Sequence, residues 1–441
     1  RFKRHHFLEP VIEFNVSRIE SLNRHVLEFL DIINKLGLEV FLIDPIVLYQ
    51  LIDDKHRQVL VDRDLLPDPV ANDISGGKEY CLSFGVFTDN FQGVVKELSQ
   101  VLTELVFEFR LIDGLDGSQR RFDKDFAQID NTFLHMFYAR NKECIQISVF
   151  HKRSDFLWVG DIPVHRSESY HNFVPKDIHY GKHESAFDSF GLEKLKTKTN
   201  ITLLIPDRVV HFISQYKSSK FIECDYSLAI NMSKNFTKSE SMNRKVREAM
   251  IALKTFTSKL FIPFFISSGT LLGWYRQCGV IPYTTDVDTG TWATYASPQL
   301  IDKFIHNDVV LKLANIYGYI DNGLQFAFYT ESHVRLDLFF MYRDGPNLTY
   351  TGHIAEERAY FRYIYPNFTL CSAELVGLKV LVPCNPVDVI TAGQLPDRLF
   401  LGAPVGTTLD LGAGILGLCV TMGCRVAGGA GGGVGVGAMT L

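Results

Sequence analysis

The chain has 441 residues, and this length favours two folded domains with additional segments over a single core. Hydrophobic residues make up 46% and charged residues 22%, which is the composition of an ordinary globular protein with a sizeable core. The mild net charge of −5 gives no electrostatic reason to expect binding to nucleic acid, which normally requires a basic face. We therefore predict no nucleic-acid partner.

Sequons and cysteines indicate the compartment. The six N-x-S/T sequons, against roughly two expected by chance, favour the secretory pathway, and their asparagines are Asn15, Asn200, Asn231, Asn235, Asn347 and Asn367. Eight cysteines permit disulfides without requiring them. The sequence has no Cys-x-x-Cys pair, so a zinc ribbon is not expected. The chain starts at Arg1 without a methionine, so the basic start either follows a missing membrane anchor or is an arbitrary end.

The first half, residues 1–225, has the pattern of a mixed α/β domain. Helical spacing of apolar residues predicts an amphipathic helix over 17–36, and the charged stretch 53–78 is expected to be a loop. Strands are expected over 38–43, 81–87, 101–111 and 144–150. The histidines show no metal-ligand spacing, so we expect His151 and the others to lie on the surface.

A second unit is expected over residues 226–390. Its predicted elements are a helix over 237–260, a strand over 261–266, a short helix over 271–278 that stops at Gly279, a helix starting at Ser297, a hairpin of strands over 323–329 and 334–342, and a strand over 378–382. Residues 391–441 are rich in glycine and form a low-complexity tail, which we expect to be disordered or an artefact of the gene model.

The candidate chemistry lies in residues 267–290 and on the later hairpin. Asp286 and Asp288 are two residues apart, so on a strand their carboxylates project from the same face, roughly 7 Å apart at the backbone. Two such carboxylates repel each other unless a cation joins them, and Mg²⁺ or Mn²⁺ prefers these hard oxygen ligands. Asp337 lies on a strand whose opposite face is apolar, which fixes its register. If the two strands are neighbours, three carboxylates surround one or two metal ions, as phosphoryl or nucleotidyl transfer requires.

A candidate anion site precedes these acids. Gly269 and Thr270 lie at a strand-to-helix turn, where backbone N–H groups can bind a phosphate. Arg276 on the following helix is placed for a bidentate phosphate contact, and Tyr283 for stacking on a base or sugar. Each feature alone is common, since a lone D-x-D is usually a solvated turn and a lone arginine is usually a surface residue. Their order, however, is typical of the nucleotidyltransferase superfamily.

The stretch LLGWYRQCGVIPYTTDVD resembles the signature of the fukutin/LicD family, which includes bacterial LicD phosphocholine transferases. The pattern L-L-G-x-x-R, then I-P, then D-x-D, is that of the whole group, and W-Y-R-Q-C-G is similar to its fukutin branch. Further similarity occurs at 40–45, 150–158, 335–340 and 382–386, so the resemblance covers roughly residues 20–390. It implies an α/β (α+β) fold in which a mixed α/β stem precedes a nucleotidyltransferase-like catalytic domain with a mixed sheet.

The resemblance also implies an activity, a donor and an acceptor. It implies a metal-dependent phosphotransferase that moves ribitol 5-phosphate from CDP-ribitol onto a phosphorylated O-mannosyl glycan of the α-dystroglycan type. By matching position, the catalytic and metal-binding acids are Asp286, Asp288 and Asp337, with Asp337 also a candidate acceptor for the hydroxyl proton. The substrate-binding candidates are Gly269, Thr270, Gly273, Arg276 and Tyr283.

The implied setting is the Golgi membrane. The resemblance implies a single-pass type II protein with a lumenal catalytic domain, an anchor upstream of Arg1, and other Golgi glycosyltransferases as further partners. The residues alone leave two alternatives open. One is a LicD-like transferase that uses CDP-choline, CDP-glycerol or a nucleotide-sugar, and the other is a non-catalytic Golgi scaffold for glycosyltransferases.

Overall fold

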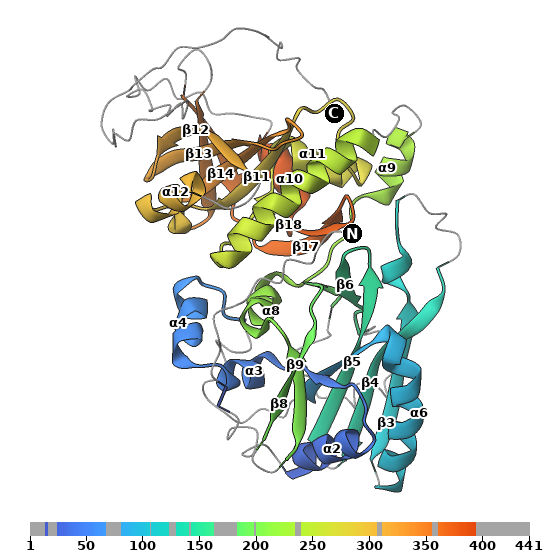
Figure 1. Cartoon of the computed structure of the whole chain (residues 1–441). Coiled ribbons are helices and arrows are strands. Elements are labelled where there is room, and N and C mark those ends of the chain that lie inside the picture. Colours follow the sequence, from blue (N-terminus) through green and yellow to red (C-terminus); the bar gives the residue numbers. More distant parts are fainter. Residues whose placement is uncertain are drawn as a thin grey trace.

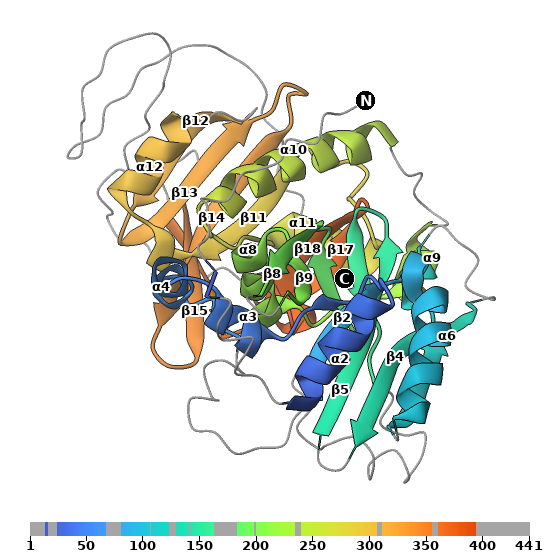
Figure 2. The same cartoon turned by 60° about the horizontal axis from the view of Figure 1, so that its bottom comes forward.

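The computed structural model describes residues 14–15, 24–67, 81–105, 107–122, 129–140, 143–162, 183–197, 200–233, 240–306, 311–354 and 360–393. These residues form two units, each built around a mixed sheet and its own hydrophobic core. Figures 1 and 2 show the blue-to-green first unit packed against the yellow-to-orange second unit. The predicted mixed α/β fold is therefore confirmed.

The first unit is built on a nine-stranded sheet with the path β3-β4-β5-β2-β1-β9-β8; β6 pairs with β5, and β7 pairs with β6. The pairs β2–β5 and β1–β9 are parallel and the other pairs are antiparallel. Its strands are β1 (Phe41–Leu42), β2 (Cys81–Phe87), β3 (Glu108–Leu115), β4 (Asn131–Arg140), β5 (Glu143–Arg153), β6 (Phe156–Val159), β7 (Ser185–Asp188), β8 (Leu192–Lys196) and β9 (Thr202–Pro206). Its α-helices are α2 (Arg24–Lys35), α3 (Pro45–Leu51), α4 (Asp54–Asp62), α6 (Thr88–Glu104) and α8 (Val209–Gln215).

Local sequence signals explain several of these elements, and the structure corrects three predictions. Asp44 is buried and its carboxylate accepts from the amides of the first turn of α3, so it caps the helix that follows β1. The expected loop over 53–78 contains α4, which Asp53 caps. The expected strand over 101–111 begins inside α6, whose buried residues recur every three or four positions. His151 is 3% exposed and bonds to a main-chain carbonyl, so its predicted surface position was wrong.

The second unit is built on a seven-stranded sheet with the path β10-β11-β14-β13-β12, and β15 and β16 extend from β14. The strands β11 and β14 are parallel, and the neighbouring pairs are antiparallel. Its helices are α9 (Tyr226–Ser233), α10 (Glu240–Lys259), α11 (Ser268–Gln277), α12 (Pro298–Ile305) and α13 (Pro386–Gly393). Its strands are β10 (Phe265–Ile266), β11 (Asp286–Trp292), β12 (Lys312–Tyr319), β13 (Asn322–Tyr329), β14 (Arg335–Asp344), β15 (Leu348–Ile354) and β16 (Tyr360–Pro366).

The predicted helices and hairpin of this unit are present, with differences in helix bounds, as at α11. Ser297 caps α12 as expected, with its hydroxyl accepting from the amide of Leu300 at 3.1 Å. Helix α11 begins at Ser268, three residues before the predicted start, and ends at Gln277, one residue before the predicted end. Cys278 rather than Gly279 takes the left-handed conformation, with φ of 47°. Cys278 forms a disulfide with Cys224, which ties the end of α11 to the segment that connects the units.

A separate hairpin, β17 (Leu370–Leu375) and β18 (Leu378–Pro383), joins the two units. It lies between the two sheets in Figure 1, and Ser372 forms a bridge with Phe221 of the connecting segment. Contacts also cross directly, because the Tyr295 hydroxyl donates to the carbonyl of Arg63 at 2.6 Å. Within the described residues, no helix combines the length and the apolar character needed to span a membrane.

The predicted limits of the two domains stay predictions, although each sheet lies within one of the predicted ranges. The predicted low-complexity tail, 391–441, lies outside the described residues except for the last three residues of α13.

Candidate metal and phosphate site

The three candidate acids meet because β11 and β14 are parallel neighbours. The register sets Asp286 opposite Arg335 and Asp288 opposite Asp337, and the period of two places all four side chains on one face of the sheet. One carboxylate oxygen of each aspartate lies within 4.8 Å of the others. Asp337 is 4% exposed, whereas the other two aspartates are partly open to solvent. The structure thus brings together the acids that the sequence spacing singled out.

Asp288 is the most strongly perturbed of these acids. Its Oδ2 accepts from the amide of Gly269 at 3.0 Å, and its own amide donates to the hydroxyl of Thr270 at 2.8 Å. Burial raises the pKa of Asp288 to about 7, and the charges of Asp286 and Asp337 add to this effect. The first turn of α11 therefore holds Asp288 in place, while the neighbouring acids oppose its ionisation.

Asp337 faces a cation that the sequence analysis did not assign to the site. The Arg335 Nε donates to Asp337 at 3.0 Å, and this contact opposes the upward shift that burial imposes on the pKa of Asp337. The Arg335 side chain is 36% exposed, and its terminal nitrogens make no hydrogen bond to any residue that the structure describes. The signal was present in the sequence, because Arg335 is two residues before Asp337 and so shares its face of the strand.

The acids fit a hard divalent cation. A set of carboxylate oxygens from three side chains is the donor chemistry of Mg²⁺ or Mn²⁺. The raised pKa of Asp288 gives the physical reason, because the cluster is electrostatically unfavourable when fully ionised without a cation. Asp286, Asp288 and Asp337 are therefore the residues that would hold the ion.

The other predicted substrate contacts are distributed along α11 and the loop after it. Gly269 and Thr270 touch Asp288 directly, and a Cβ on Gly269 would lie 3.2 Å from the Asp288 carboxylate. Gly273 instead packs on the loop, where a Cβ would meet the carbonyl of Gly279 at 2.9 Å. Arg276 has a buried Nε without a partner in the described part of the chain, and Tyr283 is 55% exposed. Substrate binding by these residues stays a prediction.

A cavity of about 320 Å³ adjoins the acids on the same face of the sheet. Phe339 and Met341, which follow Asp337 on that face of β14, line it together with the start of α11. The hydroxyls of Ser267 and Thr351 are buried in its walls, and neither has a hydrogen-bond partner among the described residues. Buried polar groups without partners are unusual and are expected where a ligand or water completes them. Sequence analysis did not identify this cavity, because Thr351 comes from the distant strand β15.

Five of the six predicted glycosylation sites can be located. Asn15, Asn200, Asn231, Asn347 and Asn367 are exposed. Asn235 lies outside the described residues. Glycosylation at these positions stays a prediction.

A glycine turn, a short helix, a D-x-D strand and a parallel neighbour with a third acid together define a nucleotidyltransferase-type domain. Residues 13–260 match the family described as Fukutin N-terminal, and residues 261–385 match the family described as LicD/FKTN/FKRP, nucleotidyltransferase domain. The chain therefore belongs to the fukutin/LicD family.

Named relatives support the same assignment. Ribitol-5-phosphate transferase FKTN of Macaca fascicularis and that of Homo sapiens are each 30% identical over 385 residues, covering 84% of this chain and 79% of the relative. The protein of the same name from Mus musculus is 35% identical over 266 residues, covering 59% of this chain and 57% of the relative. Among solved structures, the Megavirus polyadenylate synthase aligns with a TM-score of 0.15 and 7% identity over 83% of this chain and 69% of its own, a likeness too weak to carry any argument.

Proposed function

We propose that this chain is a metal-dependent transferase that moves ribitol 5-phosphate from CDP-ribitol onto the phosphorylated O-mannosyl glycan of an α-dystroglycan-type glycoprotein. The observation that carries the proposal is the parallel register of β11 and β14, which gathers Asp286, Asp288 and Asp337 on one face. The relatives named ribitol-5-phosphate transferase supply the reason to choose this donor.

The proposed reaction is an in-line displacement at phosphorus. The acceptor hydroxyl attacks the phosphorus attached to ribitol, the new phosphorus–oxygen bond forms as the bond to CMP breaks, and CMP leaves. A divalent ion held by Asp286, Asp288 and Asp337 would offset the negative charge of the donor diphosphate. The hydroxyl proton passes to a carboxylate of this cluster, for which Asp337 is the candidate.

Arg335 and the start of α11 are proposed to bind the donor phosphates. The terminal nitrogens of Arg335 are available on the face of the acids, and a guanidinium that contacts phosphate oxygens contributes strong, charge-assisted hydrogen bonds. The start of α11 lies beside Asp288, to which the Gly269 amide donates, and the N-terminus of this helix favours the same anion. These contacts position the donor, whereas the acids would hold the cation that offsets the charge that develops during transfer.

We also propose that the chain works in the Golgi lumen as part of a type II membrane protein, alongside other Golgi glycosyltransferases. Three cysteine pairs support an oxidising compartment: Cys81–Cys144, Cys224–Cys278 and Cys371–Cys384. The exposed sequons fit the same route. Digestion with endoglycosidases of the protein expressed in cells, combined with microscopy against a Golgi marker, tests this proposal. A protein that lacks N-glycans and fails to overlap the marker would contradict it.

The direct test of the activity uses purified protein, CDP-ribitol, Mg²⁺ and a phosphorylated O-mannosyl glycopeptide. We expect release of CMP and a mass gain of one ribitol phosphate on the glycopeptide. Asp286→Asn and Asp288→Asn should each abolish turnover, while Asp302→Asn, at a carboxylate that is 73% exposed on α12, should leave it unchanged. Full turnover in either active-site variant would exclude the assigned site.

A panel of donors separates the remaining alternatives. Turnover with CDP-choline, CDP-glycerol or a nucleotide-sugar, in place of CDP-ribitol, would support the assigned site but identify a different donor. A scaffold predicts no metal-dependent binding of any CDP compound, which titration calorimetry measures without requiring turnover.

A further inference from the structure

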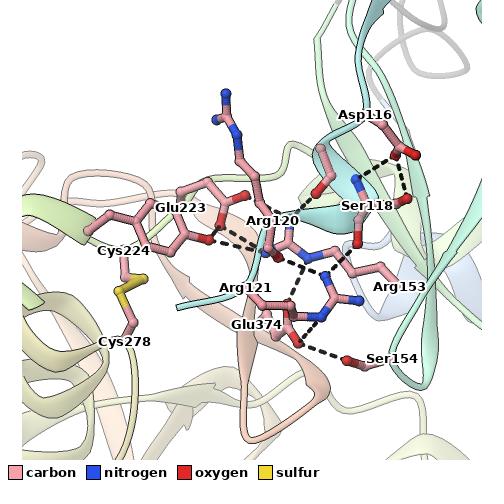
Figure 3. Close-up of polar contacts among 12 residues, drawn as sticks. Asp116, Ser118, Arg120, Arg121, Arg153, Ser154, Glu223, Cys224, Cys278 and Glu374 are labelled. Atoms are coloured by element: carbon pink, nitrogen blue, oxygen red, sulfur yellow. Dashed lines mark hydrogen bonds and ion pairs between the residues drawn. A yellow bond between two sulfur atoms is a disulfide. The ribbon is translucent and has the colours of Figure 1, made fainter. Parts of the chain in front are cut away.

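The disulfide between Cys224 and Cys278 lies where a thiol can reach it. Both cysteines line a cavity of about 520 Å³ that residues of both units surround, and Figure 3 shows the bond next to Glu223. Of the three disulfides among the described residues, this is the one whose two cysteines are both partly exposed, whereas Cys81 and Cys371 are completely buried. Exposed disulfides are the ones that exchange with thiols most readily.

The conformation of Cys278 is unfavourable for a cysteine. It ends α11 in the left-handed region, with φ of 47° and ψ of 36°. A residue with a Cβ is disfavoured in this region by roughly a factor of ten, whereas glycine adopts it freely. Gly279 follows immediately and is the residue type that usually ends a helix in this way. The sequence therefore offers a better helix end one residue later, which the folded chain does not use.

The segment on the other side of the disulfide prevents that later helix end. A helix that ended with Gly279 in the left-handed conformation would need its amide to donate to the carbonyl of Tyr275. That carbonyl already accepts from the amide of Asp225 at 3.0 Å, and Asp225 directly follows Cys224. The Gly279 amide instead points to the carbonyl of Gly273, at a long distance of 3.5 Å. The disulfide thus holds the competing donor against α11.

The loop after α11 connects this helix end to the acid cluster. It packs directly on α11, because a Cβ on Gly273 would lie 2.9 Å from the carbonyl oxygen of Gly279 and 3.1 Å from the amide nitrogen of Ile281. The Ile281 carbonyl accepts from the amide of Thr284 at 3.1 Å, and the Thr284 hydroxyl donates to the carboxylate of Asp286 at 3.0 Å. A different helix end would therefore move the loop that positions Asp286.

We propose that the Cys224–Cys278 bond is a redox-sensitive switch of the acid cluster, and its effect on turnover rests on the proposed function. A thiolate of a dithiol reductant attacks one sulfur of the bond and forms a mixed disulfide, and the second thiol of the reductant then releases that sulfur. The reductant leaves as a disulfide, and two electrons and two protons pass to the two cysteines. Tyr275 then loses its contact with Asp225, Gly279 takes the left-handed conformation, and the loop draws Asp286 away from the other acids.

The conformational preference released at Cys278 sets the expected size of the effect. If the roughly tenfold preference favours the new helix end, about one tenth of the reduced chains keep the oxidised arrangement. The apparent affinity for Mg²⁺ then falls about tenfold. Titration calorimetry of the full chain with Mg²⁺, before and after mild reduction with dithiothreitol, measures this change. Alkylation and peptide mapping should find Cys224 and Cys278 labelled first, and earlier labelling of the other two pairs would overturn the proposal.

Two matched double variants separate the helix end from the loss of the bond itself. Cys224→Ser with Cys278→Ser should bind Mg²⁺ about tenfold more weakly than the oxidised wild type. Cys224→Ser with Cys278→Gly should bind within about twofold of the oxidised wild type, because glycine accepts the left-handed conformation without a penalty. Neither should respond to dithiothreitol. Equal Mg²⁺ affinities of the two double variants would overturn the proposal.

A third double variant controls for the general loss of stability. Cys81→Ser with Cys144→Ser removes the bond between β2 and β5 of the first unit, and its Mg²⁺ affinity should equal that of the wild type. A tenfold loss in this variant as well would show that any missing disulfide weakens the site, which would contradict a specific switch.

Hydrogen exchange separates the switch from the proposed activity, because it requires no metal, donor or turnover. Peptides that cover residues 279–286 should exchange about tenfold faster in the reduced chain than in the oxidised chain, while peptides from the sheet of the first unit should not change. Equal exchange of the loop in the two redox states would overturn the switch. Absence of CMP release in both states, with exchange of the loop still dependent on reduction, would defeat the proposed function and leave the switch standing.

Discussion

Replacement of Asp288 by asparagine should stabilise the protein in the absence of metal at neutral pH. Burial and the charges of Asp286 and Asp337 raise the pKa of Asp288 from 3.8 to about 7. Between these two values the folded chain binds more protons than the unfolded chain. The free energy of unfolding therefore falls as the pH rises from about 4 to about 7. Asparagine does not titrate, so the variant avoids this loss.

The magnitude follows from the size of the shift. A rise of about three pKa units corresponds to about 4 kcal/mol, which is an upper limit. Because Asp288 is partly open to solvent, we expect the variant to gain about 2 kcal/mol over the wild type at a pH of about 8. The gain should shrink towards a pH of about 5, where the wild-type side chain is mostly protonated.

Chemical denaturation in EDTA and in Mg²⁺ measures the effect. A ligand at a hundred times its dissociation constant stabilises the folded protein by about 2.7 kcal/mol. Saturating Mg²⁺ should therefore make the wild type more stable than the variant, the reverse of their order in EDTA. Asp302→Asn, at an exposed carboxylate, controls for the general effect of removing a charge. The reasoning fails if the variant is less stable than the wild type in EDTA at neutral pH, or if Mg²⁺ stabilises both proteins equally.

Three further predictions concern the donor, the packing of α11 and its disulfide. Arg335→Ala should weaken binding of CDP in saturating Mg²⁺ about tenfold or more, because it removes a phosphate contact, and should strengthen binding of Mg²⁺, because it removes a competing cation. Unchanged CDP affinity in calorimetry would show that Arg335 has a structural role alone. Gly273→Ala should destabilise the folded protein by about 1–3 kcal/mol, because the new Cβ would meet main-chain atoms. Gly93→Ala in α6, where a Cβ would meet nothing within 4 Å, should be neutral or stabilising. Equal unfolding midpoints for the two variants would contradict this contrast. Cys224→Ser should lower the free energy of unfolding by about 4 kcal/mol, the chain-entropy value for a loop of 54 residues. Peptide mapping of the wild type without reductant should recover Cys224 linked to Cys278, and recovery of both as free thiols would refute the pairing.

The acid cluster was predictable because its pattern is local. A spacing of two residues places Asp286 and Asp288 on one face of a strand whatever the rest of the chain does. The apolar face of β14 likewise fixed the side to which Asp337 points. What the sequence did not contain was the pairing partner of β11. The parallel contact of β11 with β14, which makes three separate acids one site, depends on packing across the whole sheet.

The failures have the same origin in long-range packing. Val101 and Leu102 are apolar and were assigned to a strand, but Leu102 ends a stripe that begins at Phe91 and buries one face of α6. The charged residues of α4 gave no clear apolar stripe, and a capping aspartate started the helix instead. The cavity beside the acids was also missed. Its wall combines residues from strands and helices that are distant along the chain, and no spacing rule relates such residues.

Helix α11 connects the acid cluster to the contact between the two units. Its first turn bonds to Asp288, and its last residue lines a cavity that residues of both units surround. Cys278, which follows it, is tied to Cys224 next to Glu223, and Glu223 pairs with the buried Arg153 of the first unit. A displacement of the first unit would therefore be transmitted to the end of the helix that positions the acids. This connection gives a structural reason why the second unit is packed against the first, since contacts from both units hold the end of α11 in place.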